Sequence, residues 1–179
     1  DERDEWLAAE QEELKSIAEH GVWTLVDPTP GMNVLGSKFV YKLKRHPDGT
    51  IDKFKVRLVA QGFKQKQGVD YQEVVATTAA LQAIRMVLWI ATFYKFFIWK
   101  LDIKTFFLYG ELEEQIFMKQ PPGYEQGNKV CLLVKSLYGL KQSMRRALMV
   151  LSEQLALRGI FPLKTDQNIY YRKNEMGVV

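Results

Sequence analysis

Cysteine and histidine are scarce in this chain, which has 179 residues but only one cysteine and two histidines. The single Cys131 cannot form an intramolecular disulfide, whereas a secreted domain of this size more often carries an even set of cysteines. His20 and His46 are far apart and have no Cys or His neighbour at ligand spacing, so we expect both at the surface and no structural zinc site. These absences favour an intracellular, reducing compartment over secretion.

Long apolar runs are also missing. The longest, over residues 86–94, is interrupted by Thr92 and followed by Lys95, far short of the ~20 residues that a membrane-spanning helix needs. The acidic residues 1–5 have neither the positive nor the apolar region of a signal peptide, and they include no initiator Met. We therefore expect a fragment of a longer protein with no membrane segment.

What the chain does contain is typical of one folded domain. Its hydrophobic fraction is 47%, with 12% aromatic and 26% charged residues, which argues against long disorder. The formal net charge of +4 is mild, so the distribution of the cations matters more than their total.

Hydrophobic periodicity predicts a mixture of helices and strands. We expect helices over residues 4–20, 79–94 and 145–158, and strands over residues 22–26, 97–104, 130–134, 169–171 and 177–179. The helix over 79–94 is apolar nearly all round, so we expect it at the centre of the core, capped by Thr77 or Thr78.

A β-hairpin over residues 38–58 is the clearest local prediction, because two alternating runs flank the turn sequence HPDG at 46–49. If Arg45 pairs with Thr50, Tyr41 lies opposite Phe54 on an apolar face. The other face then collects six cations, namely Lys38, Lys42, Lys44, Lys53, Lys55 and Arg57.

Cations that face one another across strands repel, so such a surface usually has an anion in view. Phosphate is the commonest anion that rewards clustered Lys and Arg, which makes nucleic acid a candidate ligand. The alternative is a lysine-rich edge ribbon whose charges protect it against aggregation.

One carboxylate lies in an apolar, strand-like run, at Asp102 within residues 100–110. An ionised carboxylate in such a segment is costly unless a charge neutralises it, and at a strand end the partner is often a divalent metal. The alternative is a structural role, in which Asp102 caps the next helix or pairs with Lys104.

Five blocks occur in order along the chain: FKVRLVAQGF at 54–63, GVDY at 68–71, LDIKT at 101–105, QPPGY at 120–124 and KSLYGLKQ at 135–142. Together they resemble the reverse transcriptase of copia-type LTR retrotransposons, and the resemblance covers about residues 6–171. It implies an RNA-directed DNA polymerase of α+β class with a right-hand fold, fingers plus partial palm, truncated at its C-terminus. Residues 1–179 would then be a single partial domain, with an N-terminal helix and lead-in over about 1–31. The fingers hairpin and loop would cover about 32–75, and a partial palm with returning fingers elements about 76–179.

The resemblance also implies roles for particular residues. Asp102 resembles the first metal-binding, catalytic aspartate of the palm, where two Mg²⁺ ions promote attack of the primer 3′-hydroxyl on the α-phosphate. Lys55 and Arg57 match the block that contacts the incoming deoxynucleoside triphosphate. Phe107 matches the residue beside the sugar 2′ position, although an ordinary core aromatic is an equal alternative.

The remaining matches concern template and primer. Tyr138 and Gly139, with Lys141 and Gln142, match the block that packs against the template and the nascent base pair. A plain strand-to-helix turn is the alternative for this block. With Lys38, Lys42, Lys44 and Lys53 as further phosphate contacts, the implied partners are an RNA or DNA primer-template and deoxynucleotides.

The family pattern is incomplete. The second acidic cluster, usually Tyr-Val-Asp-Asp, would follow residues 174–179, and neither Asp166 nor Glu175 lies in a context that could replace it. We therefore expect this chain alone not to polymerise, since one carboxylate cannot hold two Mg²⁺ ions. The thumb, RNase H, protease and integrase parts of such a Pol polyprotein are also missing, and its location would be a cytoplasmic virus-like particle or the nucleus.

Several positions inside the matched blocks depart from the family. Phe106 stands where the family usually has Ala, and Tyr109 where it usually has Asn. Residues 76–78, Met144 and Ala147 replace a usual Ser-Pro-Val, Pro and Trp. The functional alternatives are therefore a non-catalytic, sequence-independent nucleic-acid-binding remnant that uses the basic hairpin face, or a decayed fragment without a stable fold.

Overall fold

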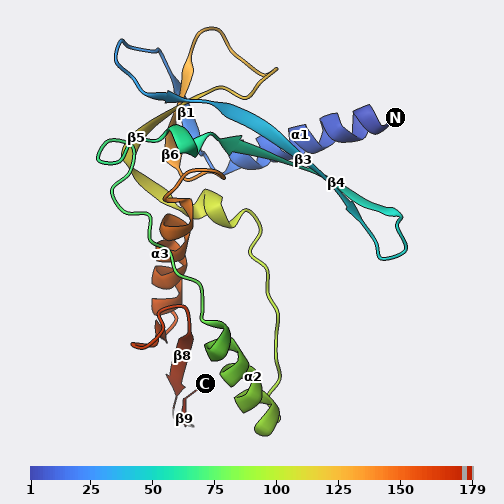
Figure 1. Cartoon of the computed structure of the whole chain (residues 1–179), viewed down its shortest axis with the longest axis vertical. Helices are drawn as coiled ribbons and strands as arrows, with labels where there is room; N and C mark the ends of the chain where they lie inside the picture. The colour runs from blue at the N-terminus through green and yellow to red at the C-terminus, as the bar shows by residue number, and fades with distance from the viewer. Residues whose placement is uncertain (175–176, 179) are drawn as a thin grey trace.

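The computed structural model describes residues 1–174 and 177–178, and therefore leaves Glu175 and Val179 outside the described part (Figure 1). Its helices are α1 (Glu2–Glu19), α2 (Leu81–Phe93) and α3 (Ser143–Ala156), with 3₁₀ turns η1 (Gly62–Lys64) and η2 (Phe106–Tyr109). Its strands are β1 (Trp23–Val26), β2 (Val34–Leu35), β3 (Ser37–Arg45), β4 (Ile51–Ala60), β5 (Glu111–Lys119), β6 (Val130–Lys135), β7 (Ile160–Pro162), β8 (Tyr170–Asn174) and β9 (Gly177–Val178). The architecture is mixed α+β.

The central sheet has the strand order β1-β6-β5-β2. β6 pairs antiparallel with both β1 and β5, and β2 pairs parallel with β5. Strands β1 and β6 confirm the sequence predictions, whereas β5 was not predicted, because its first half reads Glu-Leu-Glu-Glu and lacks a β-branched pattern. The sheet contributes to the hydrophobic core on which α1, the end of β4 and residues 137–140 pack.

The hydrophobic core lies where α1, the sheet, the end of β4 and the turn before α3 meet. Its members are Ile17, Val22, Leu35, Leu58, Ala60, Leu108, Ile116, Met118, Cys131, Leu133, Leu137 and Leu140. They come from segments far apart in sequence, so the core fixes the end of β4 against residues 137–140.

Strands β3 and β4 form a two-stranded ribbon that projects from the sheet beside α1 (Figure 1). The predicted register is wrong by two residues: Tyr41 pairs with Val56 and Leu43 with Phe54, because Arg45 pairs with Ile51 and the ladder is irregular beside it. A shift of two residues keeps every side chain on its predicted face. The predicted division into an apolar and a cationic face is therefore confirmed.

Helix α1 packs along this ribbon. Trp6 meets Phe54 and Tyr41 edge-on, with ring centroids 4.7 and 5.4 Å apart. The Tyr41 hydroxyl donates to Glu10 (2.5 Å), and so does the hydroxyl of Tyr124 (2.8 Å). The helix thus covers apolar ribbon surface and also reaches the edge of the opposite, cationic side, where Glu12 pairs with Lys53.

The prediction that residues 79–94 form a central core helix is wrong in its packing. α2 forms at that place, but Ala91 is its buried member, Trp89 is 64% exposed, and Figure 1 places the helix away from the central sheet. The predicted threonine cap is also wrong, since Ala80 is the N-cap and makes no side-chain hydrogen bond. An apolar helix is buried only where other elements cover it.

The strand predicted over residues 97–104 is absent. This segment is irregular, and Phe97, Trp99 and Leu101 are 93%, 82% and 87% exposed. It is bounded by two residues with left-handed backbone, Lys95 (φ 55°) and Thr105 (φ 52°). Alternation alone does not make a strand, because the backbone groups also need a partner strand.

Strands β7, β8 and β9 form a separate small sheet, which lies below the central sheet in Figure 1. β7 pairs antiparallel with β8, and β8 with β9. The predicted helix over 145–158 corresponds to α3 (Ser143–Ala156), and the predicted strand over 169–171 overlaps the start of β8 at residues 170–171. Within the described residues, no helix has the length and apolarity required to cross a bilayer.

Candidate nucleic-acid interface

Six cations share the face of the ribbon opposite its apolar side, and we call this set the cationic face: Lys38, Lys42, Lys44, Lys53, Lys55 and Arg57. Two pairs of lysines lie directly across the ladder, Lys42 from Lys55 and Lys44 from Lys53. Like charges at opposed positions destabilise a ribbon. The sequence therefore accepts a local cost at this surface.

The internal compensation for these charges is small. Lys53 forms an ion pair with Glu12 of α1 (3.1 Å), the one ion pair that this face makes within the described residues. Burial, together with the charges of Arg57, Lys44 and Lys53, holds the pKa of Lys55 below its usual value. The face therefore carries uncompensated positive potential that an external anion would relieve.

Two aromatic rings complete the inner end of this face. The Arg57 guanidinium lies over the Tyr138 ring, 4.8 Å from its centroid, and Tyr138 meets Phe107 edge-on at 4.9 Å. The Arg57 Nε is buried and has no hydrogen-bond partner among the described residues. Three residues predicted to bind nucleotide thus lie in one row, although they are separated by up to 81 positions in sequence.

The turn at residues 137–140 brings Tyr138 to this place. The backbone N–H of Ala60, at the end of β4, donates to the carbonyl of Tyr138 (2.8 Å). Gly139 has φ +91°, and an added Cβ there would lie 2.2 Å from the Ala60 carbonyl oxygen. Glycine is required because two backbones approach too closely for a side chain.

A cavity of about 360 Å³ lies beside β4, between α1 and residues 102–105. Lys44, Lys53, Lys55 and Arg57 line it together with Glu12, Glu13, Asp102 and Tyr138. Burial raises the pKa of Glu13, although the Leu58 N–H that donates to its carboxylate (3.1 Å) acts in the opposite direction. The walls carry more cations than carboxylates, and this favours an anionic ligand.

Asp102 lies at the rim of this cavity, on the exposed irregular segment. Within the described residues it forms neither the ion pair with Lys104 nor the helix cap that the sequence allowed, since the N-cap residue of η2 is Thr105. The other carboxylates that line the cavity are Glu12, paired with Lys53, and Glu13, which accepts from the Leu58 N–H. No group of three or more His, Cys, Asp or Glu that could hold a metal exists in the described part of the chain, so these residues do not fit a pair of Mg²⁺ ions.

Comparison with known proteins identifies the family of this chain. The family model described as reverse transcriptase (RNA-dependent DNA polymerase) matches residues 20–179. The chain belongs to this family. It is 37% identical to the retrovirus-related Pol polyprotein from transposon TNT 1-94 of Nicotiana tabacum, over 96% of this chain and 13% of the relative. It is 33% and 31% identical to the corresponding polyproteins from transposons RE1 and RE2 of Arabidopsis thaliana, over 100% and 98% of this chain. The chain spans about an eighth of the length of these relatives, and no solved structure matches it.

Two further predicted contacts of this reverse transcriptase chain lie apart from the cationic face. Lys141 donates to the Tyr71 hydroxyl (3.0 Å) and lies over the Tyr71 ring at 4.4 Å. Gln142 is 0% exposed; its Nε2 donates to the Asp70 carbonyl (2.8 Å), and its Oε1 accepts from Gln65 (3.0 Å). Both polar groups of Gln142 are therefore used inside the protein.

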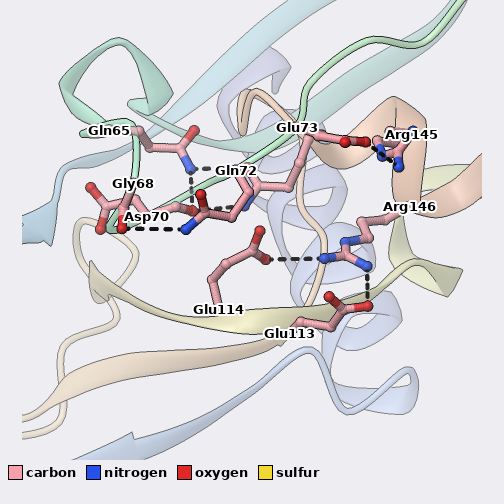
Figure 2. A network of polar contacts seen from close by, with 10 residues as sticks. Gln65, Gly68, Asp70, Gln72, Glu73, Glu113, Glu114, Arg145 and Arg146 are labelled. Carbon is pink, nitrogen blue, oxygen red and sulfur yellow. Dashed lines mark hydrogen bonds and ion pairs between the residues drawn. The ribbon is translucent and has the colours of Figure 1, made fainter.

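Figure 2 shows that this buried amide network adjoins a set of ion pairs. Arg146 of α3 contacts Glu113 (2.5 Å) and Glu114 (3.5 Å) of β5, and Arg145 contacts Glu73 (2.5 Å). The hydrogen bond to Glu113 raises the pKa of Arg146 and lowers that of Glu113. The two pairs of Arg146 attach α3 to β5 and give the acidic start of that strand a structural role, whereas the Arg145 pair attaches α3 to the segment that carries Glu73.

Sequence reasoning missed two residues beside the cavity. Glu13 was not among the predicted site residues, and its contact with the edge of β4 distinguishes it from the other acidic residues of α1. His20 is half-buried, not at the surface as expected; its Nδ1 lies 2.7 Å from the Ser16 carbonyl and its Nε2 lies 3.2 Å from the Thr105 hydroxyl. Its position at the end of α1, one residue before Gly21, was the available signal.

Proposed function

We propose that the cationic face binds the phosphates of nucleic acid and of deoxynucleoside triphosphates, as part of the RNA-directed DNA polymerase of a copia-type retrotransposon. Two pairs of opposed lysines carry the proposal, Lys42 with Lys55 and Lys44 with Lys53, on a face that makes a single ion pair within the described residues. Phosphate bound there would offset the repulsion. The row of Arg57, Tyr138 and Phe107 adds two π-faces against which a base or sugar can pack.

In this proposal the β3–β4 ribbon belongs to the fingers of a right-hand polymerase. The segment that carries Asp102, with the central sheet, belongs to its palm. The family relationship and the open cationic face support this assignment. The partners would be a primer-template, deoxynucleotides and the remainder of a Pol polyprotein, acting in a cytoplasmic particle or the nucleus.

The same proposal assigns catalysis to a longer polypeptide. Asp102 supplies one exposed carboxylate, and the Mg²⁺ chemistry of such polymerases needs several. The described residues therefore support binding more strongly than nucleotidyl transfer. In a completed polymerase, Asp102→Asn should abolish primer extension and leave nucleic-acid binding intact.

Binding of a labelled single-stranded oligonucleotide, measured by fluorescence anisotropy across a salt series, tests the proposal. Replacing Lys42, Lys53, Lys55 and Arg57 together by Gln should flatten the log–log salt slope by about 3, since each neutralised phosphate contributes roughly 0.7 for a single strand. The matched control replaces four exposed cations elsewhere, Lys15, Arg85, Lys95 and Lys164, by Gln. Equal slopes for the two quadruple variants would refute the proposal.

A further inference from the structure

A second cationic surface lies at the base of the ribbon, where β3 begins and β4 ends. It surrounds a cavity of about 500 Å³ that we call the basal cavity. Its charged and polar lining includes Lys64, Lys119, Lys129, Gln61, Asn128 and Ser37. None of these residues belongs to the cationic face, and the three lysines lie outside the five sequence blocks that resemble the family.

The three lysines are available to a ligand. All three are exposed, and within the described residues their ammonium groups form no ion pair and no hydrogen bond. The acidic residue of the lining is Glu125, whose carboxylate accepts from the backbone N–H of Gly123 (2.9 Å). The basal cavity therefore carries a net positive charge.

The wall that carries two of these lysines is held by a buried amide. The Nε2 of Gln120 donates to the Lys129 carbonyl (2.8 Å), and its Oε1 accepts from the Gln126 N–H (2.9 Å). The Gln120 carbonyl in turn accepts from the Ser37 hydroxyl (2.9 Å). The backbone that carries Lys119 and Lys129 is thus held in place by the hydrogen bonds of Gln120. A backbone that is already ordered lowers the conformational entropy that binding would cost.

An exposed aromatic ring lies next to Lys64 of the basal cavity. Phe63 of η1 is 75% exposed, and the Lys64 ammonium lies 5.8 Å from the centre of its ring. An exposed ring next to lysines is the arrangement with which proteins bind single-stranded nucleic acid, since a base stacks on the ring while the lysines contact the backbone.

The basal cavity and the cationic face are connected by β4. From Lys55 to Ala60 the strand advances roughly 17 Å at about 3.4 Å per residue, and Gln61, the next residue, lines the basal cavity. We propose that the basal cavity and Phe63 form a second contact for a single strand whose other phosphates lie on the cationic face. This inference rests on the function proposed above, because it extends the same bound strand.

The test compares two ligands on the same variants. In fluorescence anisotropy at low salt, Lys64, Lys119 and Lys129 replaced together by Gln should weaken binding of an oligothymidylate of about 12 nucleotides at least tenfold. The same variant should flatten the salt slope by about 2 and leave deoxynucleoside triphosphate binding unchanged. Phe63→Leu should weaken the oligomer about fivefold or more and leave the salt slope intact. Lys15, Lys95 and Lys164 replaced by Gln form the control, and circular dichroism checks that each variant is folded.

The possible results separate this inference from the function on which it rests. If the triple variant binds the oligomer as the control does, while the cationic-face variant is weakened, the basal contact is refuted and the proposed function stands. If the triple variant loses triphosphate and oligomer binding equally, the basal cavity is part of a triphosphate site and the inference falls. If the cationic-face variant also matches its control, both fall.

Discussion

Gly139 lies in the turn that carries Tyr138 against the end of β4, and Gly139→Ala tests the close contact between this turn and Ala60. The new Cβ would lie 2.2 Å from the Ala60 carbonyl oxygen and 2.6 Å from a methyl group of Val59. The Ala60 carbonyl belongs to backbone and is held in place, because the Gln61 N–H of the same peptide unit donates to the Gly36 carbonyl (2.8 Å). The turn must therefore move, or the ribbon must.

The magnitude follows from two contributions. A left-handed backbone costs an alanine about 1–2 kcal/mol, and φ at Gly139 is +91°. Overpacking of a tight contact adds about 1–3 kcal/mol, so the free energy of unfolding should fall by roughly 2–5 kcal/mol. Gly31→Ala is the matched control, because Gly31 has φ +90° with nothing within 4 Å of the added Cβ, and it should cost only about 1–2 kcal/mol.

Urea unfolding followed by tryptophan fluorescence measures both losses. Gly139→Ala should also weaken oligonucleotide binding, because a displaced Tyr138 no longer lies under Arg57. Equal losses of stability in the two variants would refute the reasoning, since the contact with Ala60 would then contribute nothing. The wild-type curve in the same experiment decides whether the chain unfolds cooperatively or has no stable fold.

Three further outcomes are expected. Burial raises the pKa of Glu13 in the folded protein, so the free energy of unfolding should decline as the pH rises above about 4.5, the usual pKa of a glutamate. Urea titrations across this pH range should show the decline abolished in Glu13→Gln, whose amide oxygen can still accept from the Leu58 N–H. Lys55→Met should increase the free energy of unfolding at neutral pH and weaken oligonucleotide binding. A variant that is both less stable and weaker in binding would contradict the argument that the cations repel one another. Glu10→Gln should lower the pKa of Tyr41 from about 12, a value to which burial and the Glu10 hydrogen bond both contribute, and ultraviolet titration measures it.

The ribbon shows how far a local pattern reaches. Period-two alternation placed six cations on one face, and this prediction is confirmed although the register was wrong. One residue of the error lies at the turn, where Arg45 pairs with Ile51 instead of Thr50, and the other at the ladder irregularity between Lys44 and Arg45; both depend on backbone geometry that alternation does not encode. Side chains alternate between the two faces with a period of two, so a shift of two residues changes which residues pair but leaves each side chain on the same face.

The apolar segments show the opposite case. Residues 81–93 were correctly predicted as a helix, and residues 97–104 were wrongly predicted as a strand. Both were expected to be packed, and in the structure both are largely exposed. Hydrophobicity indicates that a segment gains from burial, but burial itself requires another surface in the right place.

By itself, the sequence determined the α+β class, the family and the cationic face, because composition, motif order and alternation are properties of the chain read in one dimension. Only the tertiary structure decided that Arg57, Tyr138 and Phe107 form one row, that Gln142 is buried among amides, and that Lys64, Lys119 and Lys129 line one cavity. These arrangements depend on contacts between residues tens of positions apart. Such contacts are set by how the core, the Gly139 turn and the end of β4 pack, and local preference does not specify that packing.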